Sequence, residues 1–163
     1  MASIYLGVGS NIRPVWHLRL AITELRRRFD DLETSAVYRN APIGFDGDDF
    51  LNLVVRADTD LSPVDVLRVL DEIHELAGRQ RNSVGVTARE LDIDLLLYDQ
   101  VLVDTDDLQL PRSDVLDYDF VLRPLAEIAP NYVHPRTGKR LDLHWKQFPG
   151  SLRTLQQTCI DFD

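Results

Sequence analysis

Two carboxylates near the middle of the chain have the types and the spacing that catalysis at a metal ion requires. Asp92 and Asp94 lie in residues 89–98, an otherwise apolar run that predicts a buried strand. Side chains two apart on a strand share a face, so both carboxylates are expected to point the same way. The opposite face is expected to carry Leu91, Ile93, Leu95 and Leu97. Like charges this close repel unless a cation lies between them, and magnesium is commonly held by one or two carboxylates together with substrate phosphates.

Three arginines precede this strand and strengthen the interpretation. Residues 79–89 contain Arg79, Arg81 and Arg89 and no acidic residue. Forked guanidinium groups suit phosphate oxygens, so this loop and the two carboxylates together indicate a site for a metal ion and a polyphosphate. A second interpretation stays open, because edge strands often carry charges on their solvent face to prevent aggregation.

The composition limits the classes of function. The chain has 163 residues with 44% hydrophobic and 28% charged residues, which is ordinary for one globular domain, residues 1–163. Its net charge of −9 argues against non-specific nucleic-acid binding, which relies on a basic surface. Lys139 and Lys146 are its only lysines, which argues against a lysine nucleophile and a Walker-type loop.

The single cysteine, Cys159, excludes an internal disulfide and a cysteine-based zinc cluster, and it is compatible with a reducing compartment. Neither a secretory leader nor a stretch long enough to span a membrane is evident. The expected location is therefore the cytoplasm.

The periodicity predicts how these residues are positioned. Strands are expected at residues 2–9, 32–40, 50–55 and 89–98, with helices that begin at Pro14 and Ser62. This order, β-α-β-β-α-β, is that of the ferredoxin-like fold in the α+β class. It predicts an antiparallel sheet with the two helices packed on one face.

The C-terminal part, from residue 101, is expected to form an irregular extension. It is predicted to contain a short helix within residues 116–128, ended by Pro130, and a hairpin around Thr137 and Gly138.

A bent apolar loop, residues 41–49, precedes Phe50 and Asn52, which share a strand face. A ring next to an amide suits a planar heterocycle, although taken alone the pattern is better explained by Phe50 in the core and Asn52 ending a turn. Other motifs are absent: Ile12 stands where a dinucleotide fingerprint that begins at Gly7 needs glycine. His17 and His74 are expected on helix surfaces.

Several blocks, in this order and spacing, resemble the 6-hydroxymethyl-7,8-dihydropterin pyrophosphokinase family of folate biosynthesis. The resemblance covers nearly the whole chain, and its two most specific blocks are the arginine and aspartate signature and the C-terminal stretch. The blocks are residues 5–11, 35–38, 41–44, 50–52, 78–81, 89–94 and 120–130.

The resemblance implies an ATP-dependent enzyme, a 2-amino-4-hydroxy-6-hydroxymethyldihydropteridine diphosphokinase. It would transfer diphosphate from ATP to the pterin hydroxymethyl group and release AMP. Two magnesium ions, held by Asp92 and Asp94, would bridge the triphosphate. The partners implied are the pterin and ATP, with no nucleic acid and no membrane, and the protein is expected to be a monomer.

The resemblance also assigns roles to individual residues. Catalytic roles would fall to the two aspartates and to the three loop arginines, which would also hold phosphates. The implied nucleotide contacts are Arg79, Arg81, Arg89, Leu95 and Arg112. The implied pterin contacts are Pro42, Ile43, Gly44, Phe50, Asn52 and Phe120.

The chain departs from the family pattern mainly on the nucleotide side. Residues 86–88 replace a Trp-Gly-Pro-like stretch, and Arg112 replaces a histidine. Tyr118 stands in place of an arginine, His74 in place of a glutamate and Asp107 in place of a basic residue. An alternative function is therefore a relative that binds a pterin-like ligand without this transfer or with altered specificity. A purely structural acidic domain is the third possibility.

Overall fold

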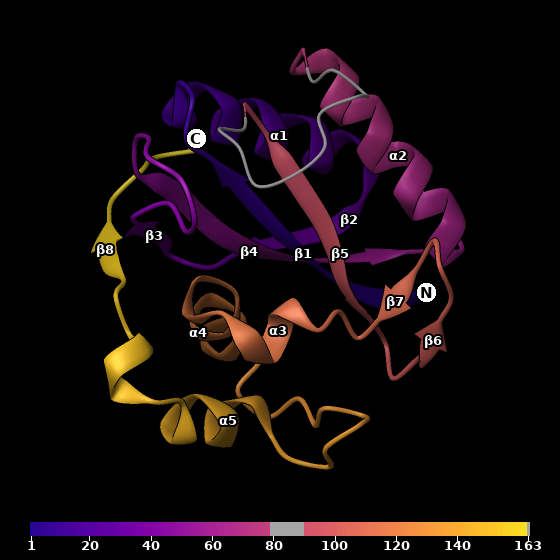
Figure 1. The fold of residues 1–163 in the computed structure, drawn as a ribbon. Helices are drawn as coiled ribbons and strands as arrows, with labels where there is room; N and C mark the ends of the chain where they lie inside the picture. Colours follow the sequence, from indigo (N-terminus) through magenta and orange to yellow (C-terminus); the bar gives the residue numbers. More distant parts are fainter. Residues whose placement is uncertain (79–89, 163) are drawn as a thin grey trace.

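An antiparallel sheet is the centre of the computed structural model, which describes residues 1–78 and 90–162 (Figure 1). The strand order is β5-β1-β4-β3-β8, and β2 pairs with β4 outside this path. The strands are β1 (Ala2–Ser10), β2 (Asp30–Thr34), β3 (Val37–Asn40), β4 (Phe50–Thr59), β5 (Asp92–Tyr98) and β8 (Gln156–Thr158). The order β5-β1-β4-β3 is that of the predicted ferredoxin-like core, and the α+β class is confirmed.

Helices α1 (Pro14–Arg28) and α2 (Pro63–Leu76) begin where the sequence predicts. The Ser62 hydroxyl accepts a hydrogen bond from the Asp65 amide at 3.2 Å, and each helix has a proline in its first turn. Gly78 follows α2 with a φ of 82°, a conformation that favours glycine at a helix end. Both helices cover one face of the sheet, over a cluster that includes Leu6, Leu18, Ile22, Leu53, Leu70 and Leu95.

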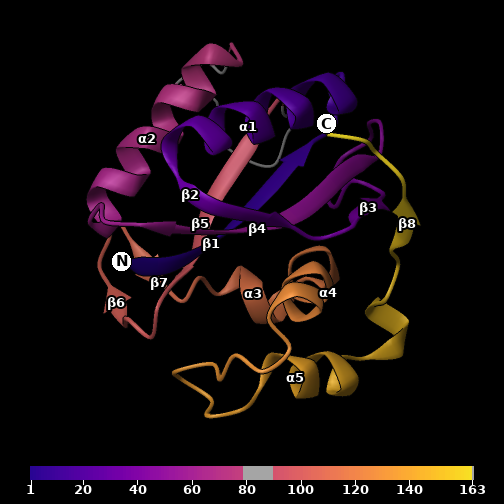
Figure 2. The same ribbon diagram turned by 180° about the vertical axis from the view of Figure 1, so that it is seen from behind.

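The second face of the sheet is also covered, so the expectation of helices on one face is incomplete. Helices α3 (Asp114–Asp117), α4 (Asp119–Ile128) and α5 (Leu141–Gln147) lie on this side (Figure 2). The sheet presents apolar side chains here too, and α4 buries them. This second cluster includes Tyr5, Val54, Leu96, Leu97, Leu122 and Leu125.

The position of Leu97 corrects the expected alternation along β5. The register with β1 shifts between Tyr5, which pairs with Leu97, and Leu6, which pairs with Leu95. Leu96 is therefore an extra residue in a β-bulge, where two successive side chains turn to the same side. As a result Leu97 packs in the cluster under α4, on the same face as Asp92 and Asp94.

Residues 32–40 form two strands rather than one, and both pair with β4. The break lies at Ser35, whose amide donates to the Val54 carbonyl and whose hydroxyl accepts from the Val54 amide, each at 2.9 Å. A side-chain oxygen thus replaces a strand carbonyl at this point, and the chain bends.

The two helix histidines are buried, which contradicts their expected exposure. His17 is 4% exposed, and its Nδ1 lies 2.6 Å from the Ile12 carbonyl oxygen. His74 is 7% exposed, and its Nε2 accepts a hydrogen bond from the Ile93 amide at 2.9 Å. Since β5 is an edge strand, this bond satisfies an amide that faces away from the sheet, and it ties α2 to β5.

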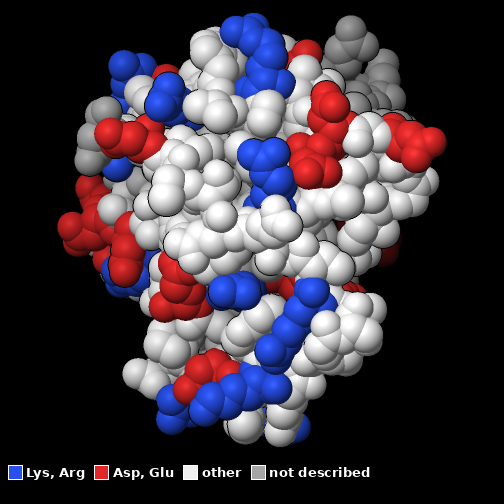
Figure 3. Space-filling view, turned by 90° about the vertical axis from the view of Figure 1, so that its left-hand side faces the viewer, with Lys and Arg blue, Asp and Glu red and all other residues white. Residues whose placement is uncertain are grey.

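Ionic and aromatic contacts attach α4 and the C-terminal segment to β3. The carboxylate of Glu127 accepts hydrogen bonds from the Tyr38 hydroxyl and, at 2.7 Å, from the Ala36 amide. The Arg123 guanidinium lies 5.1 Å from the Tyr38 ring and 5.6 Å from the Trp145 ring. On this side of the molecule basic side chains are interspersed with acidic ones (Figure 3).

The C-terminal extension is more regular than expected. The helix predicted within residues 116–128 is present as α4, which ends before Pro130, and the short α3 that precedes it was not predicted. The expected hairpin is reduced to a single bridge between Val133 and Arg140. Strand β8 was not predicted, because its sequence is short and polar and its pairing with β3 depends on tertiary contacts. The remaining elements are β6 (Val103–Asp104), β7 (Gln109–Leu110) and η1 (Gly150–Leu152).

Within residues 1–78 and 90–162, no helix has the length and apolar character needed to cross a bilayer.

The buried His134 makes the stability of the fold depend on pH. Burial lowers its pKa, and nearby His144 and Arg136 lower it further. Burial and Lys139 likewise lower the pKa of His144. Below the usual histidine pKa the unfolded chain takes up a proton that folded His134 resists, so stability falls as the pH falls.

We expect His134→Gln to lose part of the decrease in unfolding free energy between about pH 7.5 and about pH 5.5, because glutamine does not titrate. Urea unfolding of both proteins at the two pH values measures this difference. An unchanged pH dependence in His134→Gln would contradict the assignment.

Candidate active site

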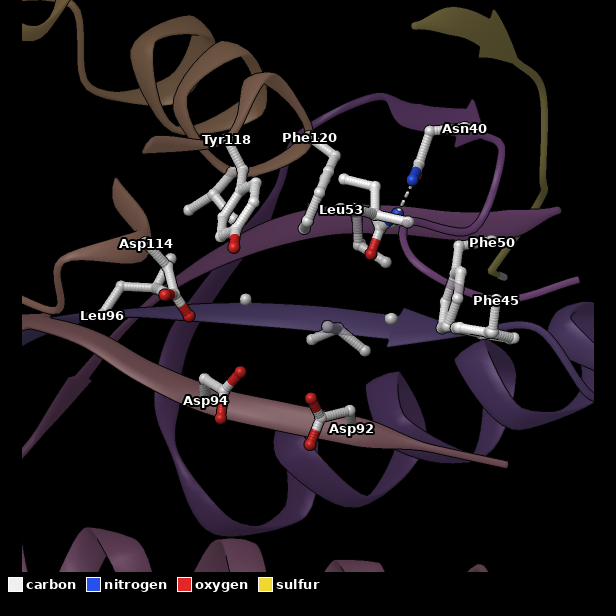
Figure 4. A pocket seen from close by; sticks show the side chains of 16 residues that line it. Asn40, Phe45, Phe50, Leu53, Asp92, Asp94, Leu96, Asp114, Tyr118 and Phe120 are labelled. Carbon is white, nitrogen blue, oxygen red and sulfur yellow. Dashed lines mark hydrogen bonds between the residues drawn. The ribbon is translucent and has the colours of Figure 1, made fainter. Parts of the chain in front are cut away.

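A cavity of about 270 Å³ lies between the sheet and the helices α3 and α4 (Figure 4). Gly7 and Gly9 of β1 lie along it, so the sheet comes to the cavity without side chains at these positions. Strands β4 and β5, the loop after β3 and the start of α4 supply the other walls. A space of this size is near the lower end of the range for sites that bind small molecules.

Aromatic rings stand on two sides of this cavity. Phe45 and Phe50 meet edge to face, with ring centroids 6.2 Å apart. On the other side Tyr118 stacks on Phe120, with ring centroids 5.0 Å apart and an angle of 20° between the rings. Figure 4 shows the two groups facing each other across the cavity. The space between them suits a flat aromatic ligand.

A pair of amides presents polar groups beside these rings. Asn52 lines the cavity and donates a hydrogen bond from Nδ2 to Oδ1 of Asn40, which is buried. A Cβ at position 9 would overlap Oδ1 of Asn52, so Gly9 allows the amide to lie against β1. The hydrogen bond between the two amides therefore fixes the orientation of the Asn52 side chain at the polar edge of the cavity.

The expected pterin contacts are brought together only in part. Phe50, Asn52 and Phe120 line the cavity, and so does Ile43 from the loop. Among the described residues, Pro42 and Gly44 belong to the same loop but not to the lining, so their proposed contacts stay predictions.

The two aspartates share the face of β5 that borders the cavity, as predicted, opposite Ile93 and Leu95. Within residues 1–78 and 90–162, no group of three or more metal-binding side chains surrounds a possible ion site. The donor set nevertheless fits magnesium, because this ion needs only one or two carboxylates when phosphate and water oxygens complete its shell.

A second hollow of about 310 Å³ lies on the other side of β5, next to α2. Asp94 borders both spaces, so it stands at their junction. Leu95, which is 2% exposed, forms part of the wall. The polar residues around this hollow are Asp71, His74, Asp94, Asp107, Gln109 and Arg112.

Arg112 is the described cation at this junction. Its Nη1 lies 3.7 Å from Oδ1 of Asp94, and its Nη2 donates to Oδ2 of Asp114 at 2.8 Å. Burial alone would lower the pKa of Arg112, but the carboxylates of Asp94 and Asp114, with a smaller effect of Asp92, outweigh burial and raise it. The guanidinium therefore stays charged and offsets part of the repulsion between the aspartates.

Arg79, Arg81 and Arg89 lie outside the described residues, and their roles stay predictions. Conversely, the sequence interpretation missed Asn40 and Asp114. The available signals were two asparagines that flank one loop, and an acid two residues after Arg112.

The chain matches the family described as 7,8-dihydro-6-hydroxymethylpterin-pyrophosphokinase over residues 5–130.

Curated proteins with similar sequences include two bacterial enzymes, each described as a 2-amino-4-hydroxy-6-hydroxymethyldihydropteridine pyrophosphokinase. The protein from Aquifex aeolicus is 36% identical over 144 residues, which cover 86% of this chain and 89% of the relative. The protein from Haemophilus influenzae is 34% identical over 142 residues, which cover 84% of this chain and 88% of the relative.

Among solved structures, Plasmodium falciparum HPPK-DHPS with SDX-DHP matches 91% of this chain with a TM-score of 0.71. The sequences are 14% identical, so this likeness shows the fold alone. The chain spans 44% of the length of that larger protein.

Substitution of Gly9 tests how tightly the Asn52 amide packs against β1 at the edge of the cavity. We expect Gly9→Ala to lower the unfolding free energy by about 1–3 kcal/mol, since the new methyl group must displace the Asn52 amide. Gly150→Ala is the matched control, because a Cβ there meets nothing within 4 Å. Denaturant unfolding measures both. Equal stabilities of the two variants would show that the amide is free to move.

Proposed function

The chain belongs to the 7,8-dihydro-6-hydroxymethylpterin-pyrophosphokinase family, and on this premise we propose that it transfers diphosphate from ATP to 6-hydroxymethyl-7,8-dihydropterin. The observation that carries the proposal is the place of Asp94, between an aromatic cavity and a second hollow that contains Arg112. A reaction that joins two substrates needs such a junction, because the reacting atoms must meet.

The aromatic cavity is the proposed pterin site. The pterin ring would lie between Phe50 and Phe120, which face each other across it, with its polar edge toward Asn52. Backbone groups near Pro42, Ile43 and Gly44 would contact the same edge. The fit of a flat heterocycle with donors and acceptors to rings and an amide supports this assignment.

The second hollow is the proposed ATP site. Arg112 would contact a phosphate, and Leu95 would contact the nucleoside from the wall. Arg79, Arg81 and Arg89 would bind further phosphates, a role supported by the sequence alone. Arginine suits these contacts because its fork matches two phosphate oxygens.

Asp92 and Asp94 would hold two magnesium ions, whose charge offsets that of the triphosphate. The pterin hydroxymethyl oxygen would form a bond to the β-phosphorus of ATP. The bond between that phosphorus and the oxygen that bridges to the α-phosphorus would break, so AMP leaves with the bridging oxygen. The hydroxyl proton is released to solvent. Such a transfer needs positioning and charge neutralisation, and no covalent enzyme intermediate.

We further propose that residues 1–163 form a single domain that acts as a monomer in the cytoplasm. The shared core of β1, β4 and β5, which contacts helices on both faces, supports the single domain.

A second candidate function is binding of a pterin-like ligand without this transfer. The acids Asp71 and Asp107 favour it, because both border the hollow proposed for a polyanionic nucleotide. Carboxylates at such a place repel phosphate unless cations accompany it.

Release of AMP tests the proposed function directly. Purified protein with ATP, magnesium and 6-hydroxymethyl-7,8-dihydropterin should form AMP, and omission of either the pterin or magnesium should stop it. Pterin binding without any AMP formation would favour the second candidate.

Neutralisation of either aspartate separates the chemistry from the fold. We expect Asp92→Asn and Asp94→Asn each to lower the rate of AMP release by at least about 100-fold, since charge stabilisation dominates phosphoryl transfer. Their melting temperatures should stay near that of the wild type, because both side chains are partly exposed. Asp30→Asn, an exposed acid in β2, is the control and should keep full activity. Full activity of Asp92→Asn or Asp94→Asn would refute the metal assignment.

A further inference from the structure

The environment of Arg112 contains an acid that the proposed reaction does not use. We propose that Asp114 is a positioning residue, which holds the Arg112 guanidinium beside Asp94 and keeps it from closing over the carboxylate. This inference rests on the proposed function, because Arg112 is taken to contact a phosphate of ATP.

The hydrogen bonds of the guanidinium define its orientation. Nε and Nη2 of Arg112 both donate to Oδ2 of Asp114, at 3.3 and 2.8 Å. Asp114 thus occupies the edge of the fork that these two nitrogens form. Nη1 points the other way and lies 3.7 Å from Oδ1 of Asp94, beyond hydrogen-bond distance. Nη1 belongs to a side chain that borders the second hollow, which is the proposed place of the phosphates.

The backbone of Arg112 is fixed as well. Its amide donates to the Leu96 carbonyl of β5 at 3.1 Å, and its carbonyl accepts from the Val115 amide of α3 at 3.2 Å. With the backbone held against β5, the remaining freedom of Arg112 is in its long side chain. The pair with Asp114 removes much of that freedom before any ligand binds, which is how preorganisation increases affinity.

The contact between Arg112 and Asp114 also keeps the guanidinium from moving onto the Asp94 carboxylate. Asp94, Arg112 and Asp114 have side chains 34%, 38% and 31% exposed, so the three charges are partly shielded from water. If Asp114 loses its charge, Asp94 and Asp92 become the described residues that attract the Arg112 guanidinium most strongly. The guanidinium would then move onto Asp94 and compete with magnesium for its oxygens.

A structural role is the competing explanation. Asp114 lies in the first turn of α3, a four-residue helix, where an acid is favourable. Asp117 lies on the same helix and is exposed, so Asp117→Asn removes a similar charge without touching Arg112 and is a matched control.

Calorimetry with α,β-methylene-ATP and magnesium measures nucleotide binding without turnover. We expect Asp114→Asn to bind this analogue about tenfold more weakly, which is typical of coupling between charged neighbours. It should also need a higher magnesium concentration for half-maximal binding. Asp117→Asn should behave as the wild type in both measurements.

A double-mutant cycle shows whether Asp114 acts through Arg112. In an Arg112→Met background, Asp114→Asn should cause no further loss of nucleotide affinity. Asp114→Glu keeps the charge and should retain part of the nucleotide affinity that Asp114→Asn loses. This variant keeps the inference testable if Asp114→Asn folds poorly. If Asp114 instead served only to start α3, the loss of nucleotide affinity in each variant would parallel a decrease in its melting temperature.

The outcomes separate the two proposals. If the wild type binds the analogue and Asp114→Asn binds it equally well, Asp114 is not a positioning residue, and the proposed function stands. An effect of Asp114→Asn that persists in Arg112→Met would also overturn the inference. A wild-type protein that neither binds the analogue nor releases AMP would overturn the proposed function, and this inference with it.

Discussion

Repulsion between two carboxylates on one face of one strand is the constraint around which the site is built. Asp92 and Asp94 cannot move apart, because β5 pairs with β1 on one side and its Ile93 amide is held by His74 on the other. A rigid element is the support that a precise site requires. Arg112 offsets part of this repulsion, and a divalent cation would add further positive charge at the same carboxylates.

One face of the sheet forms a continuous core that stabilises the fold, and the other face borders the cavity. The face under α1 and α2 is filled by leucine, isoleucine and valine, and it forms a continuous core. On the other face the apolar packing under α4 stops where Gly7 and Gly9 leave β1 without side chains. The cavity is therefore a region of incomplete packing between a sheet and a helix, and the rings of Phe50 and Phe120 border it.

Local patterns in the sequence predicted the features that depend on local physics. The two-residue spacing placed Asp92 and Asp94 on one face, and Ser62 marked the start of α2, since strand geometry and capping involve near neighbours. The side of Leu97 and the burial of His17 depend on a register shift and on tertiary contacts, which no short window contains. The pairing of β8 with β3 and the bond between Asn40 and Asn52 likewise join segments that only the folded chain brings together.

The donor set also constrains how a metal ion and a nucleotide would arrive. Two carboxylates leave most of a magnesium shell to be filled, and within residues 1–78 and 90–162 no third acid or histidine completes a cluster. A triphosphate alone would meet Asp94, Asp71 and Asp107 around the second hollow, in a chain with a net charge of −9. Each partner lacks what the other supplies, because the ions need phosphate oxygens and the phosphates need positive charge. Binding of the metal and of the nucleotide is therefore expected to be mutually dependent, with Arg112 as the fixed charge at the point where they meet.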